Sequence, residues 1–135
     1  MFPTTSTSTI RLSDPGGEIT LGSDLLKDLQ PGDDYEANDG WIAFVRPDAA
    51  SSRQIWRRSP AGVETQVSAL GRSSTIEAMG PAGEIVFTSD ASGTERRYRA
   101  RAGEDPTEVS SGLGQAIFVD GVLHVMMGST LFRVD

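Results

Sequence analysis

The stretch that decides the fold is GEIVFTSDASGTERRYRA, residues 83–100. It contains a short run of alternating apolar residues, a polar loop with a glycine, and a second short run. This pattern predicts a β-hairpin, because successive side chains of a strand point to opposite faces of the sheet. A hairpin that recurs along the chain would in addition predict an arrangement of several similar sheets.

The hairpin pattern does recur. NDGWIAFVRPDAASSRQIWRRSPAGVETQVSAL, starting at Asn38, aligns with AGEIVFTSDASGTERRYRARAGEDPTEVSSGL, starting at Ala82. A third copy starts at Val119 with VDGVLHVMMGSTLFRVD, and TIRLSDPGGEITLGSDL is a partial fourth copy near the N-terminus. The period is about forty residues. We therefore expect a single repeat domain over 1–135; its partial repeat is 8–25 and its repeats are about 33–68, 75–110 and 114–135.

Each repeat predicts four short antiparallel strands separated by turns. In the central copy we expect strands at 75–79, 84–88, 96–101 and 107–109. Asp39 with Gly40 and Asp120 with Gly121 form Asp-Gly steps, which favour tight hairpin turns with positive φ. We expect almost no helix, apart from one turn in SDLLKDLQ, residues 23–30. The predicted fold class is all-β, built from tandem four-stranded antiparallel meanders.

Tandem meanders of this length are the building blocks of β-propellers, whose blades pack face to face around a channel. The unit DGWIAFVRPDAASSRQIWRRSPAGVETQVS resembles the TolB-type six-bladed β-propeller repeat, and GEIVFTSDASG carries the same core. The resemblance implies a propeller fold and says little about function, because propellers host many activities. One departure is Arg97, which stands where the repeat usually has an apolar strand residue.

The number of strands predicts about three blades, too few to close an ordinary propeller. Three alternatives follow: a fragment of a longer propeller, two copies forming a six-bladed ring, or a compact packing of three meanders. We favour self-association into a homo-oligomer, because open blade faces and unpaired strand edges tend to find a partner. In the ring, residues 18–21 of one chain would complete the sheet of residues 131–134 in the other.

Composition argues against several classes of partner. The net charge is −7 and the chain has no cysteine. A strongly acidic chain repels the phosphate backbone and anionic lipids, so we expect neither nucleic acid nor membrane as a partner. The opening MFPTTSTST does not read as a secretory signal. The sequence leaves the localisation open, and we lean towards the periplasm or the extracellular space as part of a longer exported parent.

The residues offer little for catalysis. His124 is the sole histidine and lies in a strand pattern without a nucleophile motif, so we expect it to pack rather than to react. Metal-binding and phosphate-binding motifs do not occur in the sequence. Asp33 and Asp34 could contribute to a calcium site, although paired acidic residues are more often turn formers. We therefore expect no enzymatic activity and no cofactor.

Aromatic residues recur beside arginine at one position of each repeat: Trp56 with Arg57, Tyr98 with Arg99, and Phe132 with Arg133. Recurrence favours a structural role, with the aromatic ring between blades and the arginine extending to the rim. Trp41 has no aromatic counterpart in the other repeats. We interpret it as either a partner-binding anchor or an additional core residue.

In a propeller, the loops between the second and third strands and those between blades lie on one face, which is the usual binding surface. The charged candidates on that face are Arg46, Asp48, Arg53, Arg72, Asp90 and Glu95. We predict a non-catalytic interaction module that binds a protein or a glycan through these loops. The alternatives are a self-assembling half-propeller and, less favoured, the accessory propeller domain of a hydrolase.

Overall fold

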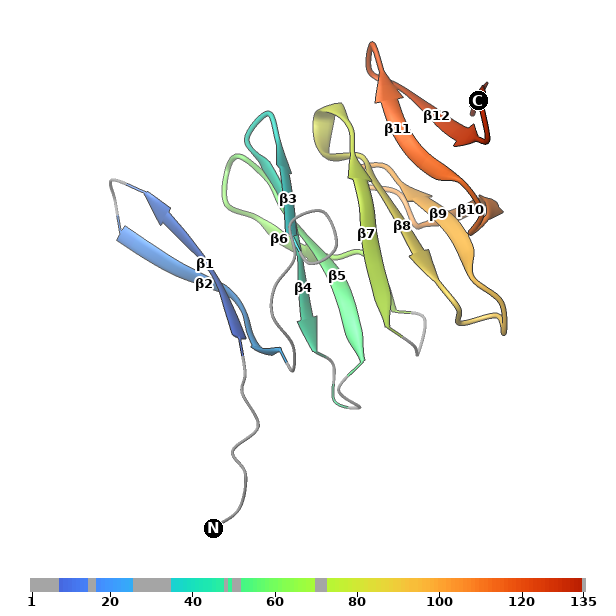
Figure 1. The fold of residues 1–135 in the computed structure, drawn as a ribbon. Helices are drawn as coiled ribbons and strands as arrows, with labels where there is room; N and C mark the ends of the chain where they lie inside the picture. Colours follow the sequence, from blue (N-terminus) through green and yellow to red (C-terminus); the bar gives the residue numbers. More distant parts are fainter. Residues whose placement is uncertain are drawn as a thin grey trace.

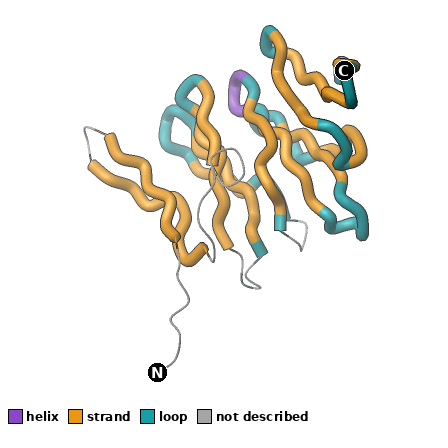
Figure 2. The backbone as a smooth tube through the Cα atoms, in the orientation of Figure 1, coloured by secondary structure: helices purple, strands orange, loops and turns teal. Residues whose placement is uncertain are grey.

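The computed structural model describes residues 8–14, 17–25, 35–47, 49, 52–69 and 73–134, the first two ranges as backbone only. Within these residues the chain folds into thirteen strands in four antiparallel sheets. The described helical structure is a single 3-10 turn at Pro81–Gly83, as Figure 2 shows. The predicted all-β class is confirmed.

The four sheets follow one another along the chain (Figure 1). The N-terminal hairpin consists of β1 (Ser8–Asp14) and β2 (Gly17–Leu25). The first sheet consists of β3 (Tyr35–Asn38), β4 (Trp41–Pro47), β5 (Arg53–Arg58) and β6 (Glu64–Gln66). The second sheet consists of β7 (Ser74–Met79), β8 (Ile85–Ser89), β9 (Arg96–Ala100) and β10 (Thr107–Ser111). The third sheet consists of β11 (Gln115–Val119), β12 (Val122–Met127) and β13 (Thr130–Arg133).

The strand register places residues that the repeats align at equivalent points of their sheets. In the first, second and third sheets, the second and third strands pair so that equivalent residues lie opposite each other. The cross-strand pairs are Phe44 with Trp56, Phe87 with Tyr98, and Val125 with Phe132. The first and second sheets have the sequential strand order of a four-stranded meander, and the third has three described strands in the same order.

The tight turns adopt the predicted backbone conformation. Asp39 and Gly40 have φ values of 53° and 83°, and Asp120 and Gly121 have 50° and 78°. Two consecutive left-handed residues are typical of the type I′ turn, whose twist matches that of the strands it joins. Each of these turns joins the first two strands of its sheet.

The N-terminal segment differs in part from the prediction. Residues 23–25 of the expected helical turn belong to β2, where the chain is extended and pairs with β1, and residues 26–30 lie outside the described residues. The hairpin lies beside the first sheet, with β2 next to β4. It stands at the opposite end of the row from the third sheet (Figure 1). Within one chain, therefore, β2 does not complete the third sheet.

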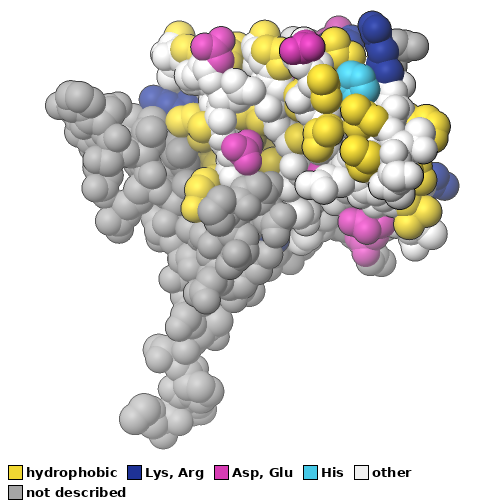
Figure 3. All heavy atoms as spheres, turned by 45° about the horizontal axis from the view of Figure 1, so that its top comes forward, with side chains coloured by type: hydrophobic (Ala, Val, Ile, Leu, Met, Phe, Trp, Pro, Cys, Tyr) yellow, Lys and Arg dark blue, Asp and Glu magenta, His cyan; other side chains and the backbone are white. Residues whose placement is uncertain are grey.

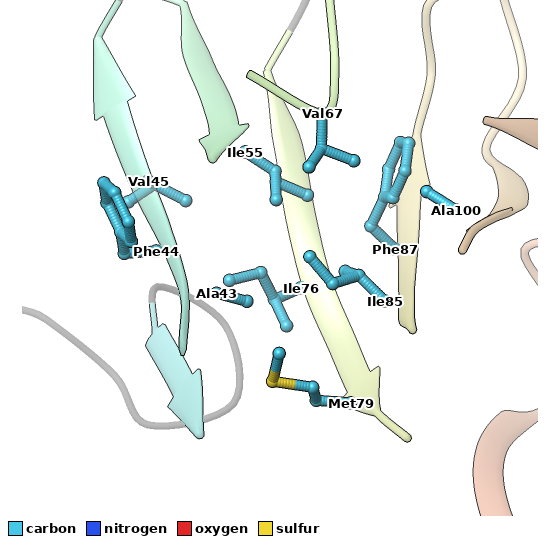
Figure 4. Close-up of a cluster of buried hydrophobic side chains, with 10 residues drawn as sticks. All are labelled: Ala43, Phe44, Val45, Ile55, Val67, Ile76, Met79, Ile85, Phe87 and Ala100. Atoms are coloured by element: carbon cyan, nitrogen blue, oxygen red, sulfur yellow. The ribbon is translucent and has the colours of Figure 1, made fainter. Parts of the chain in front are cut away.

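The hydrophobic core lies between the sheets. Ala43, Val45 and Ile55 of the first sheet pack with Ile76 and Phe87 of the second, and all five are fully buried (Figure 4). A smaller cluster joins the second sheet to the third: its buried members are Val86, Ala116 and Leu123. Among the described residues, no helix has the length and apolar character needed to span a membrane.

Candidate functional site

The loop edge is the side of the molecule where β4 and β8 end and β7 begins (Figure 1). Three hydrogen bonds hold its segments together. The backbone N–H of Arg53 donates to Ser73 Oγ at 2.9 Å, and Ser89 Oγ donates to the Ser73 carbonyl at 3.3 Å. The N–H of Gly112 donates to the Glu95 carbonyl at 2.9 Å. The loops predicted to form one face are thus connected to one another.

A pocket of about 490 Å³ lies against the β8–β9 loop. Its lining residues are Ser73, Thr75, Thr88, Ser89, Asp90, Gly93, Thr94 and Glu95. A second pocket of about 360 Å³ shares this loop and is lined by Thr94, Glu95, Arg96, Ser111, Gly112 and Leu113. Hydroxyls both donate and accept hydrogen bonds, whereas carboxylates only accept. The first pocket therefore suits a ligand that carries several hydrogen-bond donors.

The β8–β9 loop has a defined conformation of its own. The N–H of Gly93 donates to the Asp90 carbonyl at 2.9 Å, and Gly93 has a φ of 101°, which favours glycine. Ser89 Oγ accepts from the N–H of Ala91 at 3.3 Å. These local bonds fix the loop before a ligand arrives, which lowers the ordering cost of binding.

The structure brings together two of the predicted site residues, since Asp90 and Glu95 both line the first pocket. Asp48 and Arg72 lie outside the described residues, as do Asp33 and Asp34 of the suggested calcium site. Arg53 joins the loop edge through its backbone N–H.

Arg46 makes packing contacts within the first sheet. Its guanidinium lies 4.8 Å from the ring centroid of Phe44 and 4.6 Å from that of Trp56. It also pairs with Glu64 at 2.5 Å. A guanidinium over two aromatic faces and beside a carboxylate stabilises the first sheet.

Trp41 is accounted for by packing. It is partly buried against the main core cluster, and a Cβ built on Gly83 would lie 2.5 Å from the Trp41 ring. The tryptophan of the first sheet therefore rests on a glycine in the turn of the second. Of the two interpretations made from the sequence, the structure favours the additional core residue.

The prediction that the repeated arginines extend to the rim is wrong for Arg57. This residue is 5% exposed, and its Nη1 donates to the carbonyls of Gly83 at 2.8 Å and Ala100 at 3.2 Å. Nη2 donates to the carbonyl of Arg101 at 3.3 Å. Burial lowers the pKa of Arg57 from its ordinary value, but a guanidinium stays charged in proteins. Arg57 thus connects the first sheet to the second through hydrogen bonds to backbone carbonyls.

The other repeated positions diverge. Arg99 pairs with Glu84, and the side chains of both are nearly buried, so Arg99 does not reach the rim either. Arg133 is exposed. Tyr98 stacks on Phe87 with ring centroids 5.4 Å apart, as expected of a core aromatic, whereas Phe132 is 51% exposed. Equivalent residues therefore have different environments at the C-terminal end of the row.

Arg97, the departure from the repeat pattern, is fully buried. Nε and Nη2 donate to the two carboxylate oxygens of Glu77 at 3.0 and 2.9 Å. The remaining acceptors are Ser110 Oγ and the carbonyls of Ser111, Leu113 and Gly114. Glu77 in turn accepts from the N–H of Ala116 in the third sheet. These acceptors are enough for all five guanidinium N–H groups to form hydrogen bonds. Through Glu77, the buried ion pair connects the second sheet to the third.

Within the described residues, no three His, Asp or Glu residues lie close enough together to hold a metal ion. His124 is half-buried, and its Nδ1 lies 2.8 Å from the Val122 carbonyl, which fits the expected packing role.

The hydroxyl residues of the pocket were not among the predicted site residues: Ser73, Thr75, Thr88, Ser89 and Thr94. The sequence signal that could have revealed them is the pairing register of the two strands. Thr75 lies opposite Thr88 and Ser74 opposite Ser89, so the ends of two paired strands place their small polar side chains at the same edge.

Comparisons of the chain with family models, with curated proteins and with solved structures found no match.

Proposed function

We propose that this chain is a non-catalytic binding module of β-propeller type that takes its ligand at the loop edge. The observation that carries the proposal is the pocket on the β8–β9 loop, where Asp90 and Glu95 meet a group of hydroxyl side chains. Two carboxylates among hydroxyls favour a ligand with many donors. A glycan fits this lining best, because each sugar hydroxyl can donate to a carboxylate and also exchange hydrogen bonds with serine and threonine.

The arrangement of the sheets supports the propeller part of the proposal. β7 lies next to both β3 and β11, so the first strands of successive sheets are neighbours. In a propeller the first strands of the blades surround the central channel in this way. Loops that gather at one edge of such a row form a continuous surface.

A protein ligand is the second candidate, and the charge of the chain favours it. The net charge of −7 attracts basic segments, and Asp90 and Glu95 could pair with lysine or arginine. Leu113, which is 68% exposed beside the second pocket, could contact an apolar side chain.

Binding of the full chain to a glycan array and to an array of basic peptides would separate the two candidates. Asp90→Asn and Glu95→Gln should each weaken binding by about tenfold, because each removes a charged acceptor. Asp105→Asn and Glu104→Gln are matched controls, since both residues are exposed in the β9–β10 loop at the opposite edge. Equal losses in the controls, or no binding on either array, would contradict the proposal.

A further inference from the structure

The third sheet has one face that none of the described residues covers. Ala116, Leu123 and Val125 are buried on the side that meets the second sheet. Because side chains alternate along a strand, their neighbours point the other way. We name this opposite side the outer face; it comprises Ile117, Val119, His124, Met126, Leu131 and Arg133. Figure 3 shows hydrophobic side chains gathered around the histidine.

The outer face is largely apolar and accessible. Val119 is 37% exposed and Leu131 is 39% exposed, while Ile117, His124 and Met126 are partly exposed. Scattered apolar residues are normal on a surface, but a contiguous apolar face on a sheet marks an interaction site.

The equivalent face of the first sheet is an interface. By register, Met126 corresponds to Val45, Leu131 to Ile55, and Arg133 to Arg57. Val45 and Ile55 are fully buried against the second sheet, and Arg57 donates to its backbone carbonyls. The same positions of the second sheet, among them Val86 and Arg97, are buried against the third.

Each sheet has two different faces, and at both junctions one kind of face packs against the other kind. The side of the second sheet that receives Val45 and Ile55 carries Phe87 and Ile85, which lie on the opposite face from Val86. Contact between like faces does not occur at either junction. The stacking is therefore head-to-tail, and the same geometry repeated once more would place a following unit on the outer face.

Among the described residues, the N-terminal hairpin lies at the other end of the row, with β2 next to β4. In a head-to-tail contact between two copies, the hairpin end of one copy meets the outer face of the other. We propose that the outer face of the third sheet docks the N-terminal hairpin end of a second copy, and that two such contacts close a two-fold symmetric pair. The pair continues the interface that already exists twice within the chain, and closure leaves no outer face exposed. Arg133 then stands where Arg57 stands at the first junction, within reach of main-chain carbonyls of the docked copy.

Light scattering or sedimentation of the full chain over a series of concentrations tests the proposal. We expect a dimer, and we expect Leu131→Glu to raise its dissociation constant at least about tenfold, because the substitution buries an unpaired charge in the contact. Val63→Glu is the matched control, since Val63 is also an exposed apolar residue, 63% accessible, but lies away from the outer face. A monomeric wild-type chain, or equal effects of both substitutions, would overturn the proposal.

A cysteine variant tests the head-to-tail geometry. The chain has no cysteine, so Leu131→Cys introduces a single thiol. In the proposed pair the two copies of residue 131 lie in separate contacts, and mild oxidation should leave the dimer without a disulfide. Rapid formation of a linked dimer would show that like faces meet and would overturn the assignment of the hairpin as the occupant. At a protein concentration low enough for both chains to be monomeric, the thermal unfolding of Leu131→Glu should match that of the wild type. Its binding on the glycan and peptide arrays should also match, which separates this result from failure of the loop-edge site.

Discussion

The two junctions between sheets use equivalent positions in chemically different ways. At the first junction Ile55 is part of a large apolar cluster that extends from Ala43 to Ala100. At the second junction the residue equivalent to Ile55 is Arg97. Among the described residues, the apolar cluster of this junction has three buried members, Val86, Ala116 and Leu123. A network of charged hydrogen bonds takes the place of the missing apolar contacts.

The difference shows what a repeat does and does not constrain. The repeat requires that a side chain at this position reach the following sheet, whatever its chemistry. A charge is tolerated because Arg97 meets a carboxylate and several carbonyls, so that no buried donor is left without an acceptor. The stability of the apolar junction depends on how much apolar surface is buried and how well the side chains fit. The stability of the polar junction depends on every buried polar group having a hydrogen-bond partner.

The largest expected effect comes from breaking the polar junction. Arg97→Ala should destabilise the chain by about 3–5 kcal/mol, because it leaves Glu77 and several carbonyls without their charged donor. Ile55→Ala, the equivalent change at the apolar junction, should cost about 2–5 kcal/mol through the cavity it leaves. Chemical denaturation measures both.

The double variant Arg97→Met with Glu77→Met sharpens this test. Removing both charges avoids an unpaired ion, although the N–H of Ala116 then loses its acceptor. The double variant should therefore be more stable than Arg97→Ala. A double variant less stable than the single one would show that the junction depends on more than satisfying the ion pair.

The repeated aromatics provide the second test. Tyr98→Ala should cost about 3 kcal/mol, because the ring stacks on the buried Phe87. Phe132→Ala should cost less than about 1 kcal/mol, since half of that side chain is already exposed. Unfolding measured at low protein concentration keeps any self-association out of the comparison. Equal costs would mean that the third sheet packs as the second does.

The third test concerns the glycines on which aromatic rings rest. Gly83 contacts Trp41 at the first junction, and Gly80 contacts Phe118 at the second. Gly80→Ala should cost about 1–3 kcal/mol through overpacking alone. Gly83→Ala adds roughly 1 kcal/mol of strain, because its φ is 81°.

Gly93→Ala is the matched control for these glycines. Its φ is 101°, but a Cβ there would meet no atom within 4 Å. Thermal unfolding should therefore show a loss of about 1 kcal/mol, from backbone strain without a clash. A loss as large as that of Gly83→Ala would mean that strain, and not the aromatic contact, dominates at both positions.

The fold was predictable because its signals are local. Period-two alternation and the Asp-Gly turns are properties of a few neighbouring residues, and the predicted strands of the central repeat agree with β7 to β10 within a residue or two. The expected helical turn at 23–30 fails at residues 23–25, which continue an extended strand paired with β1. Pairing with a neighbouring strand outweighed the weak helical spacing of a few leucines.

The candidate site was predictable only in part. Asp90 and Glu95 could be assigned to the loop edge from the order of the strands. The hydroxyls beside them could not, because they are brought together by the pairing of β7 with β8. The packing contacts of Arg46 and Trp41 could not be predicted either: Arg46 was a candidate for the binding face, and Trp41 was left open between a partner-binding anchor and a core residue. No local pattern reveals that an aromatic ring or a glycine lies next to these side chains.

The sequence by itself determined the strands, the turns and the equivalence of the repeats, because these depend on the spacing of apolar and turn residues along the chain. Only the tertiary structure decided the roles of the arginines. Arg57, Arg97 and Arg99 look alike in the sequence, yet one reaches carbonyls of the next sheet, one fills a buried network, and one pairs within its own sheet. A guanidinium is stable in a folded interior only where acceptors converge on it, and that convergence is a property of residues far apart in the sequence.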